Sequence, residues 1–277
     1  MDSKELTIVI VTFNSEAKII DCLKSIGDQA NIIVVENSRN DNFKNDLEDK
    51  FSNLKCILTH ENLGYARANN IGLKQVTTKY ALVLNPDTTL DKHAVPRFLE
   101  RIKKNKDFWL MGPANHQMVE LEFGTNDFIE VDNLKGFAIF INLSKFNNEY
   151  FDENFFLYFE EIDLCKRVKK KKGKIYLDRL IKINHQGSKS VNNIDKLELE
   201  KNRNWHWMWS TFYYHKKHKG FFLALIIVFP KLLSAFVKTI IYSILLNKNK
   251  RDIYLSRMSG IINSIFGNKS WYRPSLD

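Results

Sequence analysis

Four short apolar runs, separated by stretches with helical spacing, constrain the fold of the first hundred residues. The runs lie at 6–11, 31–35, 55–58 and 79–84. Helices are expected between them near 19–26, 42–51 and 64–73, and after them near 91–105. Strands that alternate with helices of about 10–15 residues form a parallel sheet with right-handed crossovers. The sequence therefore predicts an α/β fold for this half of the chain.

The last of these runs ends in a way that indicates a binding site. Tyr80–Leu84 is followed by Asn85, Pro86 and Asp87. Pro86 has no N–H group and cannot continue a central strand, so the chain must leave the sheet at this point. Asp87 is then delivered to the carboxyl edge of the sheet, where open α/β sheets bind their ligands. A carboxylate there suits a divalent cation that holds nucleotide phosphates, and an aspartate in a proline-containing turn is the simpler alternative.

The pattern after residue 105 is less regular. Strands are expected at 108–112, 133–142 and 174–177, with loops over 113–132 and 183–188. A loop as long as the first usually belongs to a binding site in a compact enzyme. The aromatic run Phe155–Phe159 leads into the acidic residues Glu160, Glu161 and Asp163. The helix that follows is expected to end at Gly173, as helices often do at a glycine.

Composition and cysteine usage exclude several classes of protein. The chain has 277 residues, of which 44% are hydrophobic and 27% are charged, so disorder is not expected. Its three cysteines are far apart and show no metal-ligand spacing, and their odd number argues against a secreted disulfide framework. The N-terminus lacks the basic region that a signal peptide carries ahead of its apolar run. We therefore expect a cytoplasmic protein.

The last quarter of the chain differs from the rest in charge and in hydrophobicity. Residues 201–277 contain 13 Lys or Arg and 2 Asp or Glu, whereas the first 200 residues contain 29 basic and 30 acidic residues. Such an asymmetry indicates a polyanionic partner, either nucleic acid or anionic lipid. The apolar segment 221–246 is long enough to span a bilayer, but Pro230 interrupts it and it carries Lys231 and Lys238.

An amphipathic helix that begins near Pro230 and lies in the membrane interface explains this segment best. A spanning or re-entrant segment and an ordinary core helix are the alternatives. Trp205, Trp207 and Trp209 precede the segment and are suited to the lipid headgroup zone. Nucleic acid would explain the basic and aromatic residues but not the apolar segment, so we expect no nucleic-acid partner. A basic helical tail that forms a homodimer is the competing interpretation.

Five segments, in their order and spacing, are typical of one enzyme family. They are IVIVTFN (8–14), VVENS (34–38), NLGYARANNIG (62–72), LNPD (84–87) and FFLYFEEIDLCKR (155–167). His185, followed by Ser188 and Ser190, is a weaker sixth match. The chain resembles the GT-A-fold glycosyltransferases of family 2, especially the bacterial rhamnosyltransferase-like branch that builds surface polysaccharides on polyprenyl lipid. The match covers nearly the first 190 residues.

The resemblance implies an architecture. The GT-A fold is a mixed, mostly parallel sheet flanked by helices. It would form a catalytic domain over 1–200, with a nucleotide-binding half at 1–105 and an acceptor half at 106–200. Residues 201–277 would then be a basic, amphipathic helical extension that docks on an anionic membrane surface, where basic residues contribute about 1 kcal/mol each.

The resemblance also implies the reaction, an inverting transfer of a sugar from a nucleoside diphosphate sugar in a single displacement. The departing diphosphate gains negative charge, which Mg²⁺ or Mn²⁺ would neutralise. Asp87 is the expected metal ligand, and Asn85 stands where many relatives carry the first Asp of an Asp-x-Asp motif. His185 would supply a second ligand or contact the diphosphate, and a structural histidine is the alternative.

A carboxylate beside the substrate would take the proton of the acceptor hydroxyl. By its position in the family motif Glu161 has that role, where relatives usually carry Asp, and Glu160 and Asp163 are its rivals. The extra methylene of Glu moves the carboxylate by about 1.5 Å, which requires a compensating backbone shift. Asp163 would otherwise cap the following helix. Arg167 is expected to pair with an acid of the motif or with phosphate.

Two further groups match family positions that hold the nucleotide. The group that follows the first two strands, expected to contact the base and ribose, contains Thr12, Asn14, Glu36 and Asn37. The group at the edge of the pocket, where a glycine allows close approach of the backbone, contains Asn62, Gly64, Arg67 and Asn70. Packing, rather than contact with the nucleotide, is expected of Asn69 and Gly72.

The function implied is transfer of rhamnose or a similar sugar from a dTDP- or UDP-sugar to a polyprenyl-diphosphate-linked glycan, in O-antigen-like cell-surface polysaccharide synthesis. The enzyme would be cytoplasmic and peripheral on the inner face of the cell membrane. An N-acetylhexosamine, galactose or galactofuranose donor is an alternative, because donor choice depends on pocket shape. A family member that binds nucleotide or lipid without catalysis is a third interpretation, suggested by Asn85 and Glu161.

Overall fold

The structure is a computed structural model that describes residues 5–13, 15–113, 126–185 and 196–273. The chain divides into two compact units. The sheet unit comprises Met1–Asp152 and Glu161–Asn192, and the helical unit comprises Glu153–Glu160 and Asn193–Asp277. The chain thus enters the helical unit with the aromatic run, returns to the sheet unit at Glu161, and leaves it again after Asn192.

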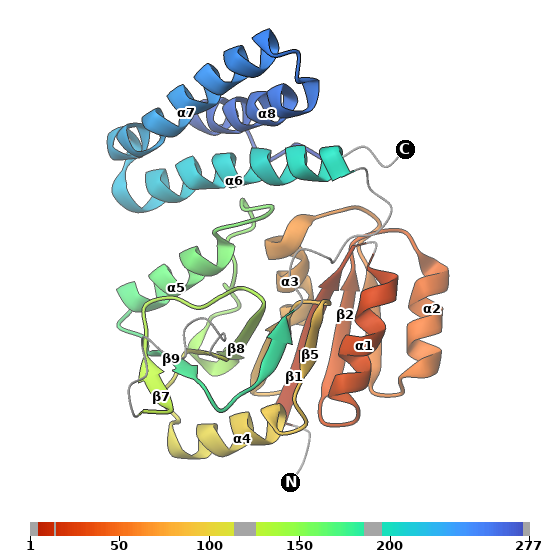
Figure 1. Ribbon diagram of the computed structural model, residues 1–277. Helices are drawn as coiled ribbons and strands as arrows, with labels where there is room; N and C mark the ends of the chain where they lie inside the picture. The colour runs from red at the N-terminus through yellow and green to blue at the C-terminus, as the bar shows by residue number, and fades with distance from the viewer. Residues whose placement is uncertain (1–4, 14, 114–125, 186–195, 274–277) are drawn as a thin grey trace. The chain divides into compact units, whose positions relative to one another are not determined.

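The sheet unit is built on an eight-stranded sheet within the described residues, in the order β3-β2-β1-β4-β8-β6-β9-β7 (Figure 1). These strands are β1 (Leu6–Thr12), β2 (Asn31–Glu36), β3 (Leu54–Leu58), β4 (Tyr80–Leu84), β6 (Leu110–Pro113), β7 (Phe128–Glu130), β8 (Ala138–Asn142) and β9 (Ile175–Asp178). A second, two-stranded sheet pairs β5 (Thr88–Leu90) with β10 (Ile183–His185). Strands β3, β2, β1 and β4 are parallel, whereas β8 is antiparallel to both β4 and β6. The mixed, mostly parallel sheet confirms the predicted fold class.

Helices cover both faces of the parallel strands, which explains why these strands are continuous apolar runs. The helices of this unit are α1 (Glu16–Ile26), α2 (Asp41–Lys50), α3 (Gly64–Lys74), α4 (Ala94–Lys104) and α5 (Glu160–Lys170). The first residue of α5 belongs to the helical unit. Apolar residues of α1, α2 and α4 form one core with Ile8 and Ile10 of β1. On the opposite face, a Cβ added to Gly72 of α3 would lie 2.5 Å from Cγ1 of Val9 and 3.0 Å from Cγ2 of Val35. Gly72 therefore has the packing role that the sequence predicts.

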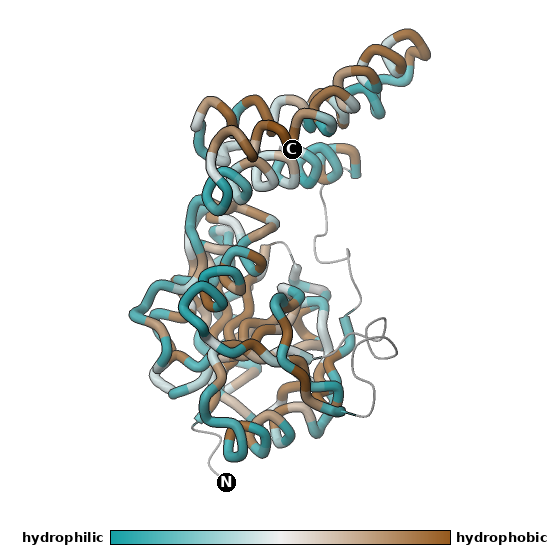
Figure 2. The backbone as a smooth tube through the Cα atoms, turned by 90° about the vertical axis from the view of Figure 1, so that its left-hand side faces the viewer, coloured by the Kyte–Doolittle hydropathy of each residue, from teal (hydrophilic) through white to brown (hydrophobic). Residues whose placement is uncertain are grey.

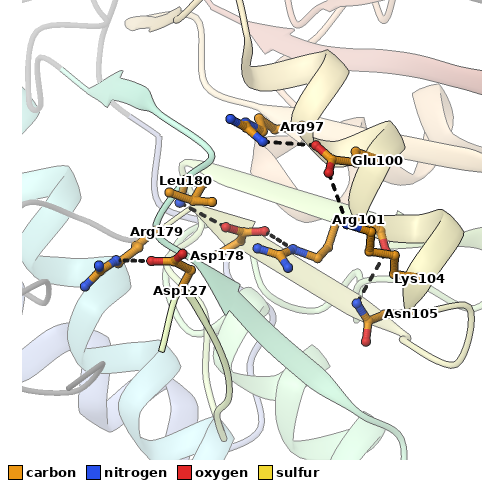
Figure 3. A network of polar contacts seen from close by, with 9 residues as sticks. All are labelled: Arg97, Glu100, Arg101, Lys104, Asn105, Asp127, Asp178, Arg179 and Leu180. Carbon is orange, nitrogen blue, oxygen red and sulfur yellow. Dashed lines mark hydrogen bonds and ion pairs between the residues drawn. The ribbon is translucent and has the colours of Figure 1, made fainter. Parts of the chain in front are cut away.

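A polar network fixes the turn between β9 and β10 (Figure 3). Arg101 of α4 donates from Nε to the buried carboxylate of Asp178 at 2.6 Å, and the N–H of Leu180 donates to the same carboxylate at 2.9 Å. Arg179 pairs with Asp127 through its side chain, and its N–H donates to the Asp127 carbonyl at 3.0 Å. The buried charge of Asp178 is thus paired and hydrogen-bonded, as burial of a carboxylate requires. The network directs the chain from the main sheet into β10.

The helical unit contains α6 (Lys196–Lys219), α7 (Phe221–Ile244) and α8 (Lys248–Ile265), and each helix packs on the other two. α7 turns Ala224 and Val228 toward α6 and α8. A Cβ added to Gly260 of α8 would lie 2.3 Å from the carbonyl oxygen of Trp205, so only glycine permits this approach of α8 to α6. Eleven large apolar side chains of α7 are exposed, and Figure 2 shows the hydrophobic character of this helix in its colour.

The interior of the helical unit contains two of the three tryptophans that the sequence predicts at a membrane surface. Trp205 is fully buried and donates from Nε1 to the Ser259 hydroxyl at 3.1 Å, and Trp209 is buried and donates to the Asn268 carbonyl at 3.0 Å. The headgroup prediction is therefore wrong for these two residues, because helix packing supplies partners for both indole N–H groups. Trp207, on another side of α6, is 43% exposed.

His206 is a buried polar group in this interior. Its Nε2 lies 2.9 Å from the carbonyl oxygen of Tyr272, which can only accept, so Nε2 carries the proton. Nδ1 then accepts from the Ser270 hydroxyl at 2.8 Å. Burial lowers the pKa of His206 to about 3, which keeps the ring neutral at physiological pH.

Four local expectations are wrong. The loop expected over 113–132 contains β7, because Phe128–Glu130 pairs with β9. α7 continues through Pro230 instead of beginning there, because a helix that packs on two neighbours tolerates the loss of one hydrogen bond on its exposed side. The strand expected over 133–142 is limited to β8, because the register with β4 begins at Ala138 and residues 136 and 137 form a turn. Ile183–His185 is a strand rather than a loop, because it pairs with β5.

Candidate active site

The carboxyl ends of β1 and β2 bring Thr12 and Glu36 together. The two residues are partners in the parallel register, and the Thr12 hydroxyl donates to Oε2 of Glu36. Both side chains are buried, and burial raises the pKa of Glu36 above its ordinary value of 4.5. They lie next to the topological switch point between β1 and β4, at which such sheets bind ligands. Asn14, expected beside them, lies outside the described residues.

Asn37 and Asn62 shape the turn in front of α3. Oδ1 of Asn37 accepts from the Leu63 N–H and the Thr59 hydroxyl, and its Nδ2 donates to the Gly64 carbonyl. Oδ1 of Asn62 accepts from the Gly64 N–H at 3.1 Å. Gly64 has a φ of +80°, a left-handed conformation that favours glycine. The Asn37 amide is therefore occupied within the protein, and it acts on the site by holding this turn.

Arg67 and Asn70 lie on α3 in different environments. Arg67 is exposed. Asn70 is buried, and its amide both donates to the carbonyl of Phe151 at 2.8 Å and accepts from the N–H of Phe151 at 3.0 Å. Asn69 is also buried and donates to the Tyr65 carbonyl at 2.9 Å. Asn70 thus fixes the chain just before the aromatic run, and we assign it a positioning role rather than a contact with the nucleotide.

Asp87 and His185 meet across the small β5–β10 sheet. His185 is the partner of Thr88 in the antiparallel register, which places its side chain beside the residue that precedes Thr88. Nε2 of His185 lies 3.2 Å from Oδ1 of the buried Asp87. The imidazole stacks on the ring of Phe137, with 4.9 Å between ring centroids and 7° between planes. The histidine is thus oriented by a strand pairing and an aromatic ring.

This pair has the donor atoms of a cation site. Oδ1 of Asp87 is buried, and Nε2 of His185 does not reach it in hydrogen-bond geometry, so this oxygen has no hydrogen-bond partner among the described residues. Buried carboxylate oxygens normally have one. A carboxylate oxygen suits Mg²⁺ or Mn²⁺, and neutral imidazole is a common metal ligand. No group of three or more His, Cys, Asp or Glu within the described ranges is placed to hold a metal, so a cation here would need ligands from a substrate or water.

Residues 135–137 connect the cation site with the acidic motif. The Phe137 carbonyl accepts from the N–H of Asn85 at 2.9 Å, and the Gly136 carbonyl accepts from the Tyr65 hydroxyl at 2.7 Å. A Cβ built on Gly136 would lie 3.5 Å from Cδ of Glu161, which is ordinary contact distance. The cation site and Glu161 therefore border the same segment. No sequence motif marks this segment, and the small residue directly before the apolar run 137–141 is the signal that could have revealed it.

Glu161 is the second residue of α5. Burial raises the pKa of its carboxyl group above 4.5, while the N–H groups of Glu161 and Ile162 and the charge of Lys135 oppose the rise. A carboxylate with a raised pKa is a stronger base near neutral pH. Glu160, the first residue of the helix, is buried and belongs to the helical unit.

Asp163 has a structural environment. It is fully buried within α5 and accepts from Nε of Arg167 at 2.8 Å, and the Arg167 guanidinium also donates to the Tyr150 carbonyl. The expectation that Asp163 caps the helix is wrong, because α5 begins three residues earlier. The prediction that Arg167 pairs with an acid of the motif is confirmed. Ser188 and Ser190 lie outside the described residues.

Comparison with protein-family models decides the family. Residues 7–164 match the model of Glycosyl transferase family 2. The chain belongs to glycosyl transferase family 2. The matched span includes the carboxyl ends of β1, β2 and β4, residues 135–137 and the beginning of α5, whereas His185 lies beyond it.

Two curated relatives match parts of the family 2 chain. It is 26% identical over 193 residues to the low-salt glycan biosynthesis hexosyltransferase Agl10 of Haloferax volcanii, which is 60% of this chain and 62% of that protein. It is 34% identical over 105 residues to a teichoic acid poly(glycerol phosphate) polymerase of Staphylococcus epidermidis, which is 35% of this chain and 15% of that protein. The chain therefore spans less than two thirds of the length of either relative.

A solved structure shows the same fold. The mannosyltransferase PcManGT from Pyrobaculum calidifontis, in complex with GDP-Man and Mn²⁺, matches with a TM-score of 0.56 and 10% identity, over 96% of this chain and 88% of that chain. At this identity the likeness shows the fold alone. The fold is the GT-A fold, as the resemblance of the five segments implies.

Proposed function

We propose that this family 2 chain is a metal-dependent, inverting glycosyltransferase that moves a sugar from a nucleoside diphosphate donor to a glycan acceptor. The observation that carries the proposal is the surroundings of residues 135–137. A carboxylate–imidazole pair with an unsatisfied buried oxygen borders this segment on one side, and a carboxyl group with a raised pKa borders it on the other. Family membership supports sugar transfer as the reaction.

The donor would lie along the carboxyl edge of the parallel strands. Thr12 and Glu36 would contact its base and ribose, and the Asn62–Gly64 turn would bring backbone N–H groups toward the nucleotide. The diphosphate would lie at Asp87, between the edge of the sheet and His185. When bound by these two residues, Mg²⁺ or Mn²⁺ supplies positive charge that stabilises the departing diphosphate.

The acceptor hydroxyl would lie between Glu161 and the anomeric carbon. Its oxygen attacks that carbon, and its proton moves to the Glu161 carboxylate. The bond between the anomeric carbon and the diphosphate oxygen breaks, and its electron pair leaves with the nucleoside diphosphate. Attack opposite to the leaving group inverts the configuration of the sugar. Asn70 would contribute indirectly, because its amide holds the backbone of Phe151 ahead of the aromatic run.

The substrates proposed are a dTDP- or UDP-linked deoxysugar such as rhamnose and a glycan on polyprenyl diphosphate. The names of the two relatives, a glycan biosynthesis hexosyltransferase and a teichoic acid polymerase, support a role in cell-surface polysaccharide synthesis. Such an acceptor is held at the inner face of the cell membrane, so the enzyme would act there from the cytoplasm.

A donor screen with matched variants tests the proposal. Purified full-length protein is assayed against a panel of nucleotide sugars with Mn²⁺ or Mg²⁺ and a polyprenyl-diphosphate-linked acceptor. We expect Asp87→Ala and Glu161→Gln each to lower turnover by about 10²–10³-fold. The exposed Asp91→Ala and Glu149→Gln are matched controls that should retain wild-type turnover. Unchanged turnover in both site variants, or removal of metal without effect, contradicts the assignment.

The lipid carrier of the acceptor requires a docking surface, and α7 offers one. We define the α7 face as six apolar side chains at helical spacing, Phe222, Ile226, Phe229, Leu233, Ile240 and Ile244, all of which are exposed. Phe222 is 80% exposed and Ile226 is 67% exposed. Contiguous apolar surface of this kind marks an interaction site. By length and composition, Phe221–Ile244 is also able to cross a membrane.

The charge of the helical unit supports an anionic membrane as the partner of the α7 face, because residues 201–277 contain 13 Lys or Arg and 2 Asp or Glu. On the opposite side of α7, Tyr242 stacks on Tyr254 of α8, and Lys238, Lys250 and Arg257 lie 5.1, 5.2 and 6.0 Å from these ring centroids. A second copy of the chain fits less well, because an isologous interface would bring two strongly basic units together.

An interfacial position suits α7 better than a spanning one. α8 packs on α7 and carries Lys250, Arg251, Asp252 and Arg257. If α7 crossed the bilayer, these charges would have to enter hydrocarbon or α8 would have to separate from it, and both are costly. We therefore propose that the α7 face enters the interface of the inner leaflet while α6 and α8 remain outside it.

A further inference from the structure

The aromatic run has an unusual backbone immediately before the acidic motif. Tyr158 has a φ of +70° and Phe159 a φ of +71°. A left-handed conformation is uncommon for residues other than glycine and is unfavourable for bulky ones, and two in succession require support from their surroundings. Glu160 and Glu161 follow directly and form the first turn of α5. The direction in which these carboxylates leave the turn therefore depends on what holds it.

The support comes from α6, within the helical unit. The ring of Trp207 lies 5.3 Å from that of Tyr158 and 5.2 Å from that of Phe159, between centroids. Tyr214, two turns further along α6, lies 5.3 Å from Phe159. Trp207 thus contacts both strained residues. Its neighbours Trp205 and Trp209 are instead buried in the interior of the unit.

The residues ahead of the turn are attached to the same helix. The Ser210 hydroxyl donates to the Leu157 carbonyl at 2.9 Å. Phe155 contacts Tyr213 and Phe156 stacks on His206, with 4.9 and 4.5 Å between ring centroids. Five successive residues, 155–159, are therefore held by α6 through a ring contact or a hydrogen bond. Residues 153–160 leave the sheet unit in order to make these contacts.

We infer that Trp207 is a positioning residue of the glycosyltransferase: it holds Tyr158 and Phe159 in their left-handed conformation and so sets the direction of Glu161 at the beginning of α5. The inference rests on the proposed function for its catalytic consequence. Without the indole ring, the two residues relax toward ordinary backbone regions, and the first turn of α5 moves with them. A shift of about 1 Å in a catalytic group can cost about 10²-fold in rate.

The test uses the full-length chain with Trp207→Ala, Trp207→Phe and, as the matched control, Trp271→Ala. Trp271 is also an exposed tryptophan of the helical unit, but its ring contacts are Trp205 and Tyr272 rather than the aromatic run. We expect Trp207→Ala to lower kcat by about 10²-fold, with the KM for the donor changed less than about twofold, because the nucleotide end of the site lies on other elements. Trp207→Phe should restore most of the loss, and Trp271→Ala should behave as wild type.

Hydrogen exchange gives a readout that does not require turnover. In Trp207→Ala we expect amides 158–164 to exchange at least about tenfold faster than in the wild type, with other segments of the sheet unit unchanged. Equal protection of 158–164 in the two proteins, or the same acceleration in Trp271→Ala, overturns the inference. If the wild type turns over no donor while the exchange result holds, the proposed function fails and the support of the turn by Trp207 stands.

Discussion

The sheet unit and the helical unit use apolar residues in opposite ways. In the sheet unit the apolar runs of β1, β2 and β4 are buried under helices on both faces. In the helical unit the longest apolar segment, α7, remains largely exposed, while the interior contains tryptophan and histidine side chains with hydrogen-bond partners. A parallel strand must bury both faces, whereas a helix buries one side only. The hydrophobicity of a segment therefore predicts its burial well for the parallel strands and poorly for the helices of the helical unit.

The first prediction separates interior from surface within the helical unit. Trp205→Ala should destabilise the unit by about 3–5 kcal/mol, because it removes a fully buried ring and its hydrogen bond to the Ser259 hydroxyl. Phe222→Ala, on the exposed α7 face, should change stability by no more than about 0.5 kcal/mol. Urea unfolding followed by circular dichroism measures both. Similar losses for the two variants would show that the α7 face is buried in solution, and the contrast between the units would fail.

The second prediction tests what the exposed apolar surface is for. The double variant Ile226→Ser with Phe229→Ser should weaken binding to anionic vesicles by about tenfold or more, because two apolar side chains no longer enter the interface. Flotation with phosphatidylglycerol-containing vesicles at two salt concentrations measures this. The matched control is Leu255→Ser with Ile262→Ser on α8, two exposed apolar residues away from the α7 face.

Three outcomes of that experiment contradict docking by the α7 face. Equal loss in the two double variants would locate binding elsewhere. Binding to neutral vesicles that is as strong as binding to anionic ones would remove the role of the basic residues of the helical unit. A dimer in the wild type that becomes a monomer in Ile226→Ser with Phe229→Ser, with vesicle binding unchanged, would identify a second copy as the partner.

The third prediction concerns the carboxyl groups of the sheet unit. Burial raises the pKa of Glu161, so its carboxylate takes up a proton at a higher pH than an ordinary glutamate does. Activity should therefore decline on acidification with a midpoint above 4.5, since only the ionised group accepts the acceptor's proton. The pH profile of kcat at saturating substrate measures it. The acid limb should persist in Glu149→Gln, and a wild-type midpoint at or below 4.5 would rule out Glu161, with its raised pKa, as the base.

Sequence patterns alone predicted the alternation of strands and helices in the parallel half and the point at which the chain leaves the sheet beside Asp87. Residues such as Ile8, Val34 and Leu82 lie in runs that only a covered sheet can bury, and Pro86 forces the chain out of that sheet beside Asp87. These properties are local, because strand length, periodicity and the missing proline N–H do not depend on distant residues. The positions of Glu161 and His185 in the family motifs likewise made them candidate site residues.

Only the tertiary structure decided which side chains can contact a substrate and which already have partners within the protein. Asn70 matched a pocket position but is used by the backbone of Phe151, Asp163 is paired with Arg167, and Gly136 connects two parts of the site without any motif of its own. Trp205, Trp207 and Trp209 are equivalent by composition, yet two are buried and one supports a strained turn. Burial and hydrogen-bond partners come from residues far away in the chain, so no local pattern can assign them.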